Sequence, residues 1–293
     1  MLVAMILITG ATGTIGSLVL SALRQHGAEV RTMTRDPERL AATSALSAEQ
    51  IVRGDLDQPE SLPAALAGVD TVFLLTAFGP RLPEQEQNLV AAATTAGVQR
   101  IVKLSAISTG EDPTGTRPAD WHLPGEQAVR GSGLAWTVLR PAGFASNALQ
   151  WAESVRAGLP VPNTSGTGAQ GVVDPRDVAE VATAALLSPE HDGTVYTLTG
   201  PETLSVPDQT AVLAAELDRP VPVVEVDLAT VRQQMLAAGM DESIVKVTEY
   251  GLDQFRRGDA DFVTDDVQRV LGRPALSFAA WVREHRAAFE NGD

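Results

Sequence analysis

The chain has 293 residues, 44% of them hydrophobic and none of them cysteine, and its formal net charge at pH 7 is −15. This length is enough for one large domain or for a larger domain with a smaller lobe. The absence of cysteine excludes disulfides, thiolate metal sites and cysteine nucleophiles. The negative charge argues against nucleic acid as a partner. No stretch approaches the roughly 18 apolar residues of a membrane span, and the apolar start of the chain lacks a basic region and ends in a glycine turn, so we expect a cytoplasmic protein without a membrane anchor.

The first half of the chain alternates between apolar runs and helix-like segments. Apolar runs typical of buried strands lie at 3–9, 30–34, 50–53, 71–76, 101–105 and 135–139. The helix-like segments lie at about 14–26, 59–67, 84–96 and 119–131. Continuous apolar strands separated by helices predict an α/β fold, a doubly wound parallel sheet covered by helices on both faces. Ligands of such sheets bind at the carboxyl ends of the strands.

The pattern changes after Pro141. We expect a helix over 146–157, a loop over 159–168, a helix that begins at Pro175, a strand over 194–199 and, beyond Val206, mostly helix apart from a short apolar run at 221–226. The predicted division is a first domain made of 1–141 and 171–199 and a smaller C-terminal lobe made of 142–170 and 200–293.

Three glycines connect the first strand to the first helix. Gly10 allows a sharp turn, Gly13 allows the backbone to approach a pyrophosphate, and Gly16 allows the helix to pack closely on its strand. The helix N-terminus then offers unpaired N–H groups to phosphates, so this Rossmann-type domain is expected to bind a dinucleotide; the alternative is a tight turn that binds nothing. The spacing Gly-x-x-Gly-x-x-Gly resembles that of the extended and atypical short-chain dehydrogenase/reductases. The same loop contributes Thr12, Thr14 and Ile15 as expected cofactor contacts.

The second strand ends in a residue that selects the cofactor. Arg35 stands where NAD-binding sites carry an acidic residue, and a guanidinium suits a ribose 2′-phosphate. Asp36 is the rival, since it could face the ribose, but an Asp before Pro37 is also an ordinary helix start. We therefore favour NADP(H) over NAD(H), with Arg39 one helical turn away as a second cation.

Further cofactor contacts are expected where later strands end. Asp55 and Leu56 follow the third strand, where Asp55 could accept a hydrogen bond from adenine or act only as a turn residue. Small residues after the fourth strand would let the cofactor lie against the sheet edge. The expected contacts there and after the fifth strand are Thr76, Ala77 and Ser105.

Taken together, these motifs resemble the NmrA-like atypical short-chain dehydrogenase/reductases, and the match runs in order through most of the chain. It is carried by Gly10-Ala11-Thr12-Gly13, Thr34-Arg35-Asp36-Pro37, Gly54-Asp55-Leu56, Val102-Lys103-Leu104-Ser105, Leu139-Arg140-Pro141 with Phe144 and Asn147, and Asp174-Pro175-Arg176-Asp177-Val178-Ala179. That family includes NADPH-dependent quinone reductases, isoflavone-type and benzylic ether reductases, and regulators that bind dinucleotide without turning it over. The resemblance implies the fold, an NADP-binding first domain and a substrate-binding lobe, and leaves the activity open.

The usual catalytic pair of short-chain reductases, Tyr-x-x-x-Lys, is absent. The two tyrosines, Tyr196 and Tyr250, are followed four residues later by Gly200 and Gln254. In its place His122 and Glu126 stand at i and i+4, on one face if the turn is helical, and a carboxylate beside an imidazole would help it deliver a proton near neutrality. Similar His/Glu replacements occur in the quinone-reductase branch of the family. Alternatively, His122 is an exposed loop residue and Glu126 only complements the helix dipole.

An apolar slot for a flat substrate is the last expected feature. Phe144, Asn147 and Trp151 are spaced to share one helix face, and with Phe78 they could line a slot beside the nicotinamide; Trp151 is better explained as core. No metal site is expected, because the four histidines show no close ligand spacing. A homodimer is compatible with the sequence, which does not fix the oligomeric state.

The leading hypothesis is an NADPH-dependent reductase of quinones or related conjugated carbonyl compounds, acting on a small apolar or aromatic substrate. Quinone reduction depends less on a strong general acid, so loss of the tyrosine is tolerable. A non-catalytic NADP sensor that binds a protein partner and a redox-neutral tailoring enzyme of secondary metabolism are the alternatives.

Overall fold

The structure is a computed structural model that describes residues 4–44, 46–110 and 120–290. Residues 3 and 119, which begin two of the predicted elements, lie outside the described residues. The contacts divide the chain into two units. Among the described residues, unit 1 consists of 4–44, 46–110, 120–141 and 178–197, and unit 2 of 142–177 and 198–290.

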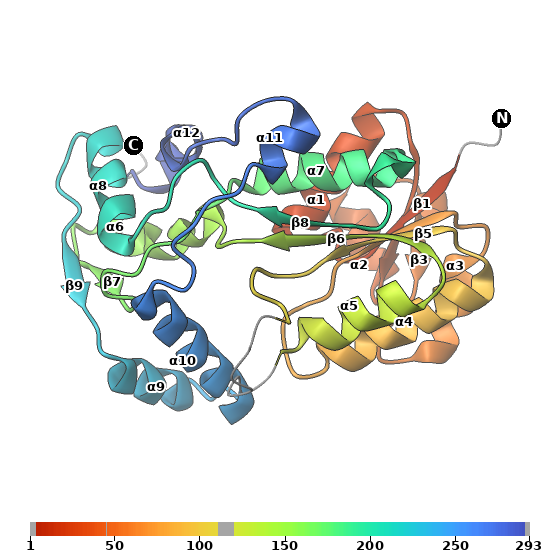
Figure 1. Cartoon of the computed structure of the whole chain (residues 1–293), viewed down its shortest axis with the longest axis horizontal. Helices are drawn as coiled ribbons and strands as arrows, with labels where there is room; N and C mark the ends of the chain where they lie inside the picture. The colour runs from red at the N-terminus through yellow and green to blue at the C-terminus, as the bar shows by residue number, and fades with distance from the viewer. Residues whose placement is uncertain (1–3, 45, 111–119, 291–293) are drawn as a thin grey trace. The chain divides into compact units, whose positions relative to one another are not determined.

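Unit 1 is built on a seven-stranded sheet with the order β3-β2-β1-β4-β5-β6-β8 (Figure 1). Its strands are β1 (Met5–Ile8), β2 (Glu29–Thr34), β3 (Ile51–Arg53), β4 (Thr71–Leu74), β5 (Arg100–Leu104), β6 (Ala135–Pro141) and β8 (Thr194–Leu198). All pairings from β3 to β6 are parallel. The order reverses between β1 and β4, which is the doubly wound Rossmann arrangement and confirms the predicted fold class.

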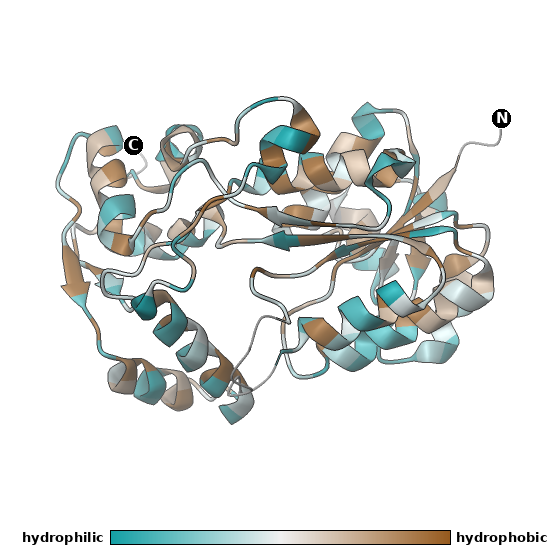
Figure 2. Cartoon of the chain, viewed as in Figure 1, coloured by the Kyte–Doolittle hydropathy of each residue, from teal (hydrophilic) through white to brown (hydrophobic). Residues whose placement is uncertain are grey.

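Helices cover both faces of this sheet. Figure 1 shows α1 and α7 on one face and α3, α4 and α5 on the other. Their bounds, with those of α2 and the 3₁₀ turns, are α1 (Thr14–Gln25), α2 (Pro37–Thr43), η1 (Ala48–Gln50), η2 (Pro59–Ser61), α3 (Leu62–Leu66), α4 (Leu82–Ala96), α5 (His122–Gly131), α7 (Pro175–Leu187) and η4 (Pro189–His191). Buried residues of β1, β4 and β5 form one core with α3, α4 and Val129 of α5. Figure 2 shows hydrophobic residues along the central strands and hydrophilic ones on α4 and α5.

Unit 2 has a second core of its own, formed by Trp151, Phe278, Trp281 and their neighbours. Its elements are η3 (Ala145–Trp151), α6 (Ala152–Arg156), β7 (Val161–Asn163), α8 (Val206–Leu217), β9 (Val223–Glu225), α9 (Leu228–Ala237), α10 (Glu242–Arg257), α11 (Asp266–Leu271), α12 (Phe278–Glu284) and η5 (Arg286–Ala288). Residues 171–177, 198 and 199, expected in the first domain, belong here. Val173 donates to the carbonyl of Gly143 and accepts from the N–H of Ala145, which ties this segment to the start of unit 2.

Two local expectations for unit 2 are corrected by the structure. The segment 159–168, expected as a loop, contains β7, which pairs in parallel with β9; the buried Asn163 side chain donates to Glu225 at 2.7 Å. Phe144, Asn147 and Trp151 were expected to share one face of an α-helix. Residues 145–151 instead form a 3₁₀ helix with three residues per turn, in which positions 144 and 151, seven residues apart, do not lie on the same face. Asn147 is accordingly exposed while Trp151 is buried in the core.

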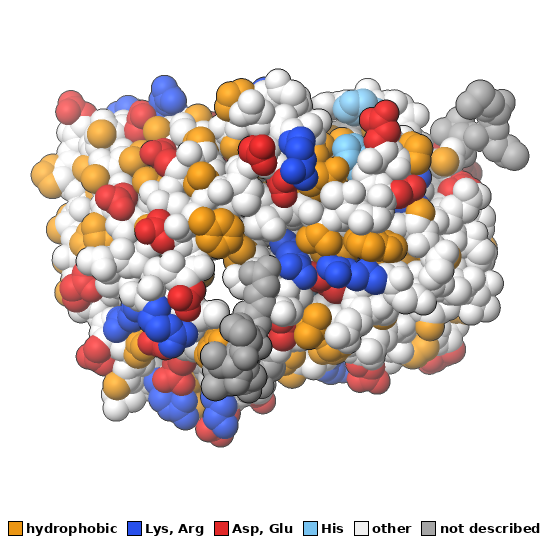
Figure 3. Space-filling model, in the orientation of Figure 1, with side chains coloured by type: hydrophobic (Ala, Val, Ile, Leu, Met, Phe, Trp, Pro, Cys, Tyr) orange, Lys and Arg blue, Asp and Glu red, His pale blue; other side chains and the backbone are white. Residues whose placement is uncertain are grey.

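The surface is mixed. Figure 3 shows acidic, basic and apolar side chains scattered over the face in view. Among the helices of the described residues, none is both long and apolar enough to cross a membrane.

The contact between the first helix and the first strand generates a stability prediction. A Cβ on Gly16 would lie 2.1 Å from the carbonyl oxygen of Gly10, so Gly16→Ala forces the α1 backbone off β1. We expect a loss of roughly 1–3 kcal/mol in the free energy of unfolding, measured in urea. Gly251→Ala in α10, where nothing lies within 4 Å, is the control and is expected to be neutral or stabilising. Equal stability of Gly16→Ala and the parent protein would contradict this packing.

Candidate functional site

The glycine loop has the geometry of an anion-binding turn. Gly10 has φ +67°, in the left-handed region, and its carbonyl accepts a hydrogen bond from the N–H of Gly13 at 3.0 Å. Gly13 is the N-cap of the twelve-residue helix α1, and Thr14 and Ile15 form its first turn. Ile15 is buried, so it can meet a ligand through its backbone only, whereas Thr12 and Thr14 are exposed.

The three glycines serve different purposes. Gly16 is required by the fold, as its contact with Gly10 shows. By contrast, a Cβ on Gly13 would meet its nearest protein atom, the Gly10 oxygen, at an ordinary 3.4 Å. The space in front of Gly13 is therefore not needed for packing within the described chain, and it is the space a pyrophosphate would use.

A cavity of about 290 Å³ opens beside this loop, at the carboxyl ends of β1, β2, β3 and β4. It gathers residues that are up to 76 positions apart in the chain, from Thr9 to Gln85. Predicted cofactor residues in its lining are Gly10, Thr12, Arg35, Asp55, Leu56, Thr76 and Ala77. Gly13, Thr14, Ile15 and Ser105 are not among its lining residues.

Arg31 lies within β2 and Arg35 directly follows it, and the two side chains differ in their contacts. Arg31 donates to the carbonyls of Ala65 and Ala67, at 3.1 and 2.7 Å. Arg35 is exposed, lines the cavity, and donates no side-chain hydrogen bond to any residue in the described part of the chain. Its rival Asp36 caps α2, because its carboxylate accepts from the N–H of Arg39 at 3.0 Å. Arg35 is thus the side chain left available for a ligand.

Two further polar groups line the cavity. The Thr76 hydroxyl is buried and has no hydrogen-bond partner among the residues that the structure describes. A buried hydroxyl without a partner is costly, and a bound polar ligand would satisfy it. Asp55 accepts from the N–H of Asp57 at 3.0 Å, so it acts in a turn as well as lining the cavity. The carboxylate of Asp57 accepts hydrogen bonds from Arg81 and Gln85.

Glu126 is held by a buried set of donors. Its carboxylate, 1% exposed, accepts from Ser105 at 2.6 Å, from Arg140 at 3.0 and 2.8 Å, and from Arg130 at 3.0 Å. Burial by itself raises the pKa of Glu126, but the hydrogen bonds from Arg140 and Ser105 outweigh it and hold the pKa below its usual value. These contacts favour a structural role for Glu126 and Ser105, in place of the predicted catalytic and cofactor roles.

His122 belongs to an aromatic cluster instead. It is the first residue of α5 and half-buried, so the expected helical geometry is present despite Pro124 and Gly125. The ring of Phe78, 57% exposed, lies 6.4 Å from the His122 ring and 4.8 Å from that of Trp121. The place of Trp121 in this cluster is not predictable from the sequence, because a buried tryptophan in a loop carries no motif.

Below this cluster lies a buried ion pair. Lys103 of β5 and Glu86 of α4 are joined at 2.8 Å, and both side chains are fully buried. The Lys103 Nζ atom also lies 3.4 Å from Nδ1 of His122. Burial raises the pKa of Glu86 to about 7 and lowers that of Lys103, although each charge partly offsets the shift of the other. A charge in this strand was visible in the sequence, but its partner was not.

Comparisons with known proteins place this chain in a family. The pattern of the family described as NAD(P)H-binding matches residues 10–189. The NAD(P)H azoreductase of Xenophilus azovorans is 36% identical over 288 residues, 97% of this chain and 99% of that protein. The (4-alkanoyl-5-oxo-2,5-dihydrofuran-3-yl)methyl phosphate reductase of Streptomyces griseus is 38% identical over 285 residues, again 97% and 99%. The chain belongs to the NAD(P)H-binding family.

Solved structures agree on the fold. The NADPH complex of the NADPH-dependent quinone oxidoreductase of Escherichia coli covers 96% of this chain and 99% of its own, with a TM-score of 0.83 at 22% identity. The NADP(H) complex of the triphenylmethane reductase of Citrobacter sp. covers 95% and 99%, with a TM-score of 0.81 at 24% identity. The predicted NmrA-like relationship is confirmed, and this member of the family is an NAD(P)H-dependent oxidoreductase.

The residues present fit the family's cofactor. The open space in front of Gly13 leaves room for the pyrophosphate. The buried Thr76 hydroxyl can form a hydrogen bond with the cofactor, and the exposed Arg35 offers a positive charge. No group of three or more His, Asp or Glu side chains in the described ranges could hold a metal ion.

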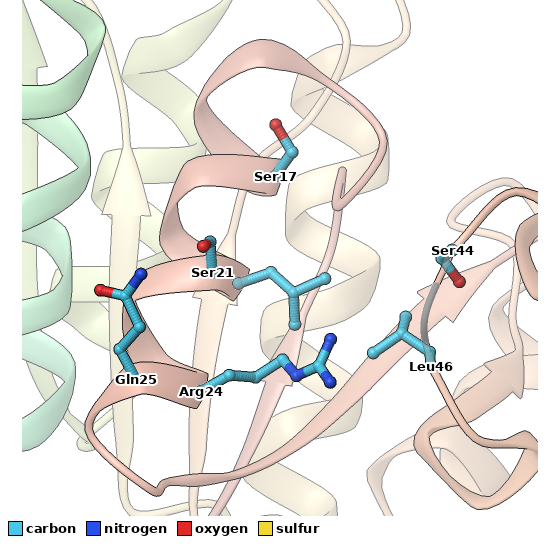
Figure 4. A pocket seen from close by; sticks show the side chains of 7 residues that line it. Ser17, Ser21, Arg24, Gln25, Ser44 and Leu46 are labelled. Atoms are coloured by element: carbon cyan, nitrogen blue, oxygen red, sulfur yellow. The ribbon is translucent and has the colours of Figure 1, made fainter.

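A separate open hollow on the outer side of α1 is lined by Ser17, Ser21, Arg24 and Leu46 (Figure 4). It contains none of the predicted site residues.

Two predicted substrate residues, Phe144 and Asn147, lie in unit 2. Phe144 precedes η3 and forms a bridge with Val173, and its carbonyl accepts from the N–H of Asn147 at 3.0 Å. Their part in a substrate slot stays a prediction.

Gly13→Ala tests whether the loop holds the cofactor. Because its Cβ would meet protein only at 3.4 Å, we expect an unchanged free energy of unfolding. The dissociation constant for NADPH, measured by fluorescence titration, should rise roughly tenfold or more, since the methyl group occupies the pyrophosphate's place. Unchanged affinity in a folded Gly13→Ala protein would remove the cofactor from this loop.

Gly125→Ala tests the close packing of α5 over the ion pair. A Cβ there would lie 1.7 Å from Oε2 of the buried Glu86. We expect a loss of roughly 1–3 kcal/mol in the free energy of unfolding. Gly131→Ala in the same helix meets nothing within 4 Å and should not destabilise the protein. Equal effects of the two substitutions would contradict the packing.

Proposed function

We propose that this protein is an NADPH-dependent reductase of quinones and related conjugated carbonyl compounds. The observation that carries the proposal is the cluster of Phe78, Trp121 and His122, which joins flat apolar rings to a group able to donate a proton. The curated relatives support the class of substrate: one is named an azoreductase, another acts on an oxo-dihydrofuran, and a third, 25% identical over 281 residues, is the quinone oxidoreductase 2 of Escherichia coli.

NADP(H) is preferred over NAD(H) in this proposal because of Arg35. Its guanidinium stands at the end of β2, where the adenosine ribose of a dinucleotide lies in Rossmann folds. A planar guanidinium can bind a 2′-phosphate through two hydrogen bonds. Asp36, which would favour an unphosphorylated ribose, is engaged in capping α2.

The proposed chemistry divides between cofactor and chain. NADPH, when bound, supplies a hydride to an electrophilic atom of the substrate. The aromatic rings of Phe78 and Trp121 hold a flat substrate and exclude water from one of its faces. His122 donates a proton to the oxygen on which negative charge develops, the part played elsewhere by tyrosine. Of the two tyrosines in the sequence, Tyr196 is buried and hydrogen-bonded to His191, and Tyr250 lies in α10 of unit 2.

Arg35→Ala tests the cofactor preference. Loss of the charged hydrogen bonds should weaken NADPH binding by roughly 10- to 100-fold and leave NADH binding unchanged. Dissociation constants for both cofactors are compared by fluorescence titration. Arg31→Lys is the control, because the Arg31 side chain already donates to the carbonyls of Ala65 and Ala67. This substitution should leave the ratio of the dissociation constants for NADPH and NADH unaltered. A parallel loss of both cofactors in Arg35→Ala would contradict a contact with the 2′-phosphate.

His122→Gln tests the reductase itself. NADPH oxidation is followed with menadione, 1,4-benzoquinone and 2-cyclohexenone. We expect turnover by the parent protein and a drop of roughly 10²–10⁴-fold in kcat for the enone, with a smaller drop for the quinones, whose reduced form is a stabilised phenolate. His191→Gln, which alters a histidine paired with Tyr196, is the control and should retain full turnover.

Binding without turnover would instead favour a sensor. If the parent protein binds NADPH and NADP⁺ comparably and shows no oxidation above a Gly13→Trp variant with any acceptor, the reductase proposal fails. The absence of Tyr-x-x-x-Lys is the feature that keeps this second candidate relevant.

A further inference from the structure

The buried pair of Glu86 and Lys103 is expensive for the fold. Both side chains are fully buried, and the second oxygen of Glu86, Oε2, has no hydrogen-bond partner among the described residues. The lysine donates to Oε1 of Glu86 at 2.8 Å and to the carbonyl of Leu104 at 3.2 Å. A buried ion pair is commonly no more stabilising than apolar side chains of the same size, and an unsatisfied carboxylate oxygen adds a cost. Stability therefore does not account for this pair.

The pair is connected to His122. The Nζ atom of Lys103 lies 3.4 Å from Nδ1 of the imidazole. An ammonium group has three donors and no acceptor, so a hydrogen bond from Lys103 to Nδ1 requires that Nδ1 be unprotonated and that Nε2 carry the proton of the neutral imidazole. The position of Lys103 in turn depends on Glu86, and α5 can lie this close only because residue 125 has no side chain.

We propose that Glu86 and Lys103 are positioning residues that hold His122 in the Nε2–H tautomer, so that this N–H is the proton donor in the reduction. This inference rests on the proposed function, since it takes His122 as the donor. In Ser-His-Asp hydrolases a carboxylate accepts a hydrogen bond from Nδ1–H and so fixes the tautomer of the histidine. Here a buried cation would fix the other tautomer, because it donates to Nδ1 and leaves the proton on Nε2.

The proton balance of the step is complete. The hydride from NADPH adds to the β-carbon of an enone, and the Nε2 proton passes to the enolate oxygen. Lys103 gives one ammonium proton to Nδ1, so that the imidazole stays neutral and Lys103 becomes a neutral amine. A proton from water then restores Nε2–H, and the Nδ1 proton returns to Lys103. The net consumption is one hydride and one proton.

The charges around Lys103 suit this exchange. Burial lowers the pKa of Lys103, which eases loss of its proton, while Glu86, Glu126 and Asp120 act in the opposite direction. Two arginines, Arg130 and Arg140, neutralise Glu126 from the other side. Glu86 is thus the carboxylate in direct contact with the ammonium group.

The first test reads the tautomer without any turnover. The ¹⁵N shifts of the ring nitrogens distinguish the two neutral tautomers, and the His122 signals are assigned by their loss in His122→Gln. We expect the Nε2–H form in the parent protein and a shift toward a mixture with Nδ1–H in Lys103→Met. Arg100→Met, which breaks the ion pair of the same strand with Asp192, is the control and should leave the tautomer unchanged. An Nδ1–H form in the parent protein, or no change in Lys103→Met, overturns the proposal.

The second test reads the consequence for catalysis. Glu86→Leu/Lys103→Met replaces both charges at once, which is commonly tolerated in a buried pair, and folding is checked by circular dichroism. Reduction of 2-cyclohexenone requires a proton, whereas malachite green, a carbocation, accepts a hydride alone. We expect enone turnover to fall roughly tenfold or more while decolourisation of the dye is retained. Equal losses on both acceptors would mean a merely structural pair.

The outcomes separate the two proposals. If the double variant does not fold, the tautomer of the parent protein decides, since an Nδ1–H form there overturns the proposal. If the parent protein turns over no acceptor, the proposed function fails while the tautomer measurement still decides whether Lys103 positions the ring.

Discussion

The first turn of α1 lies directly on the backbone of Gly10, and the rest of the site depends on that contact. The carbonyl of Gly10 occupies the space where residue 16 would carry its Cβ, so the helix begins as close to β1 as backbone atoms permit. Its free N–H groups therefore point out at the carboxyl end of β1, where the sheet order reverses toward β4. Gly13, by contrast, leaves open space in front of the loop. A side chain at position 16 would therefore disturb the fold, whereas one at position 13 would disturb only the binding of a ligand.

A second constraint acts beneath α5. Glu126 is fixed by Ser105, Arg130 and Arg140, which secures the middle of the helix to β5 and β6. The pair of Glu86 and Lys103 lies under its first turn. The helix thus presents His122 beside Phe78 and Trp121 from a rigid base, with one ring nitrogen against a cation. A hydride acceptor and a proton donor need that kind of fixed geometry more than they need a particular residue type.

The sequence predicted those parts that are encoded locally. The strands of unit 1 are continuous apolar runs, and the glycines, Arg35 and Asp36 act through their immediate neighbours, so their places were foreseeable. By contrast, β7 lies in a Pro- and Gly-rich segment and becomes a strand only because β9 pairs with it.

The partners of buried charges could not be foreseen for the same reason. Glu126 was expected beside His122 because they are four residues apart, yet Arg140 from the next strand reaches its carboxylate. Lys103 was visible as a charge in an apolar strand, but its partner Glu86 lies in another element, on the same helix face as Leu82 and Val90. Such contacts depend on tertiary packing, which no spacing rule records.

Deuterium transfer from the cofactor tests the central claim, that this unit both holds NADPH and passes its hydride to a conjugated substrate. NADPH deuterated at C4 of the nicotinamide, as each of its two epimers, is incubated with the protein and 2-cyclohexenone, and the ketone product is analysed by mass spectrometry. The account predicts deuterium at the β-carbon from one epimer and none from the other. Saturating NADPH binding with no deuterium in the product from either epimer would contradict it.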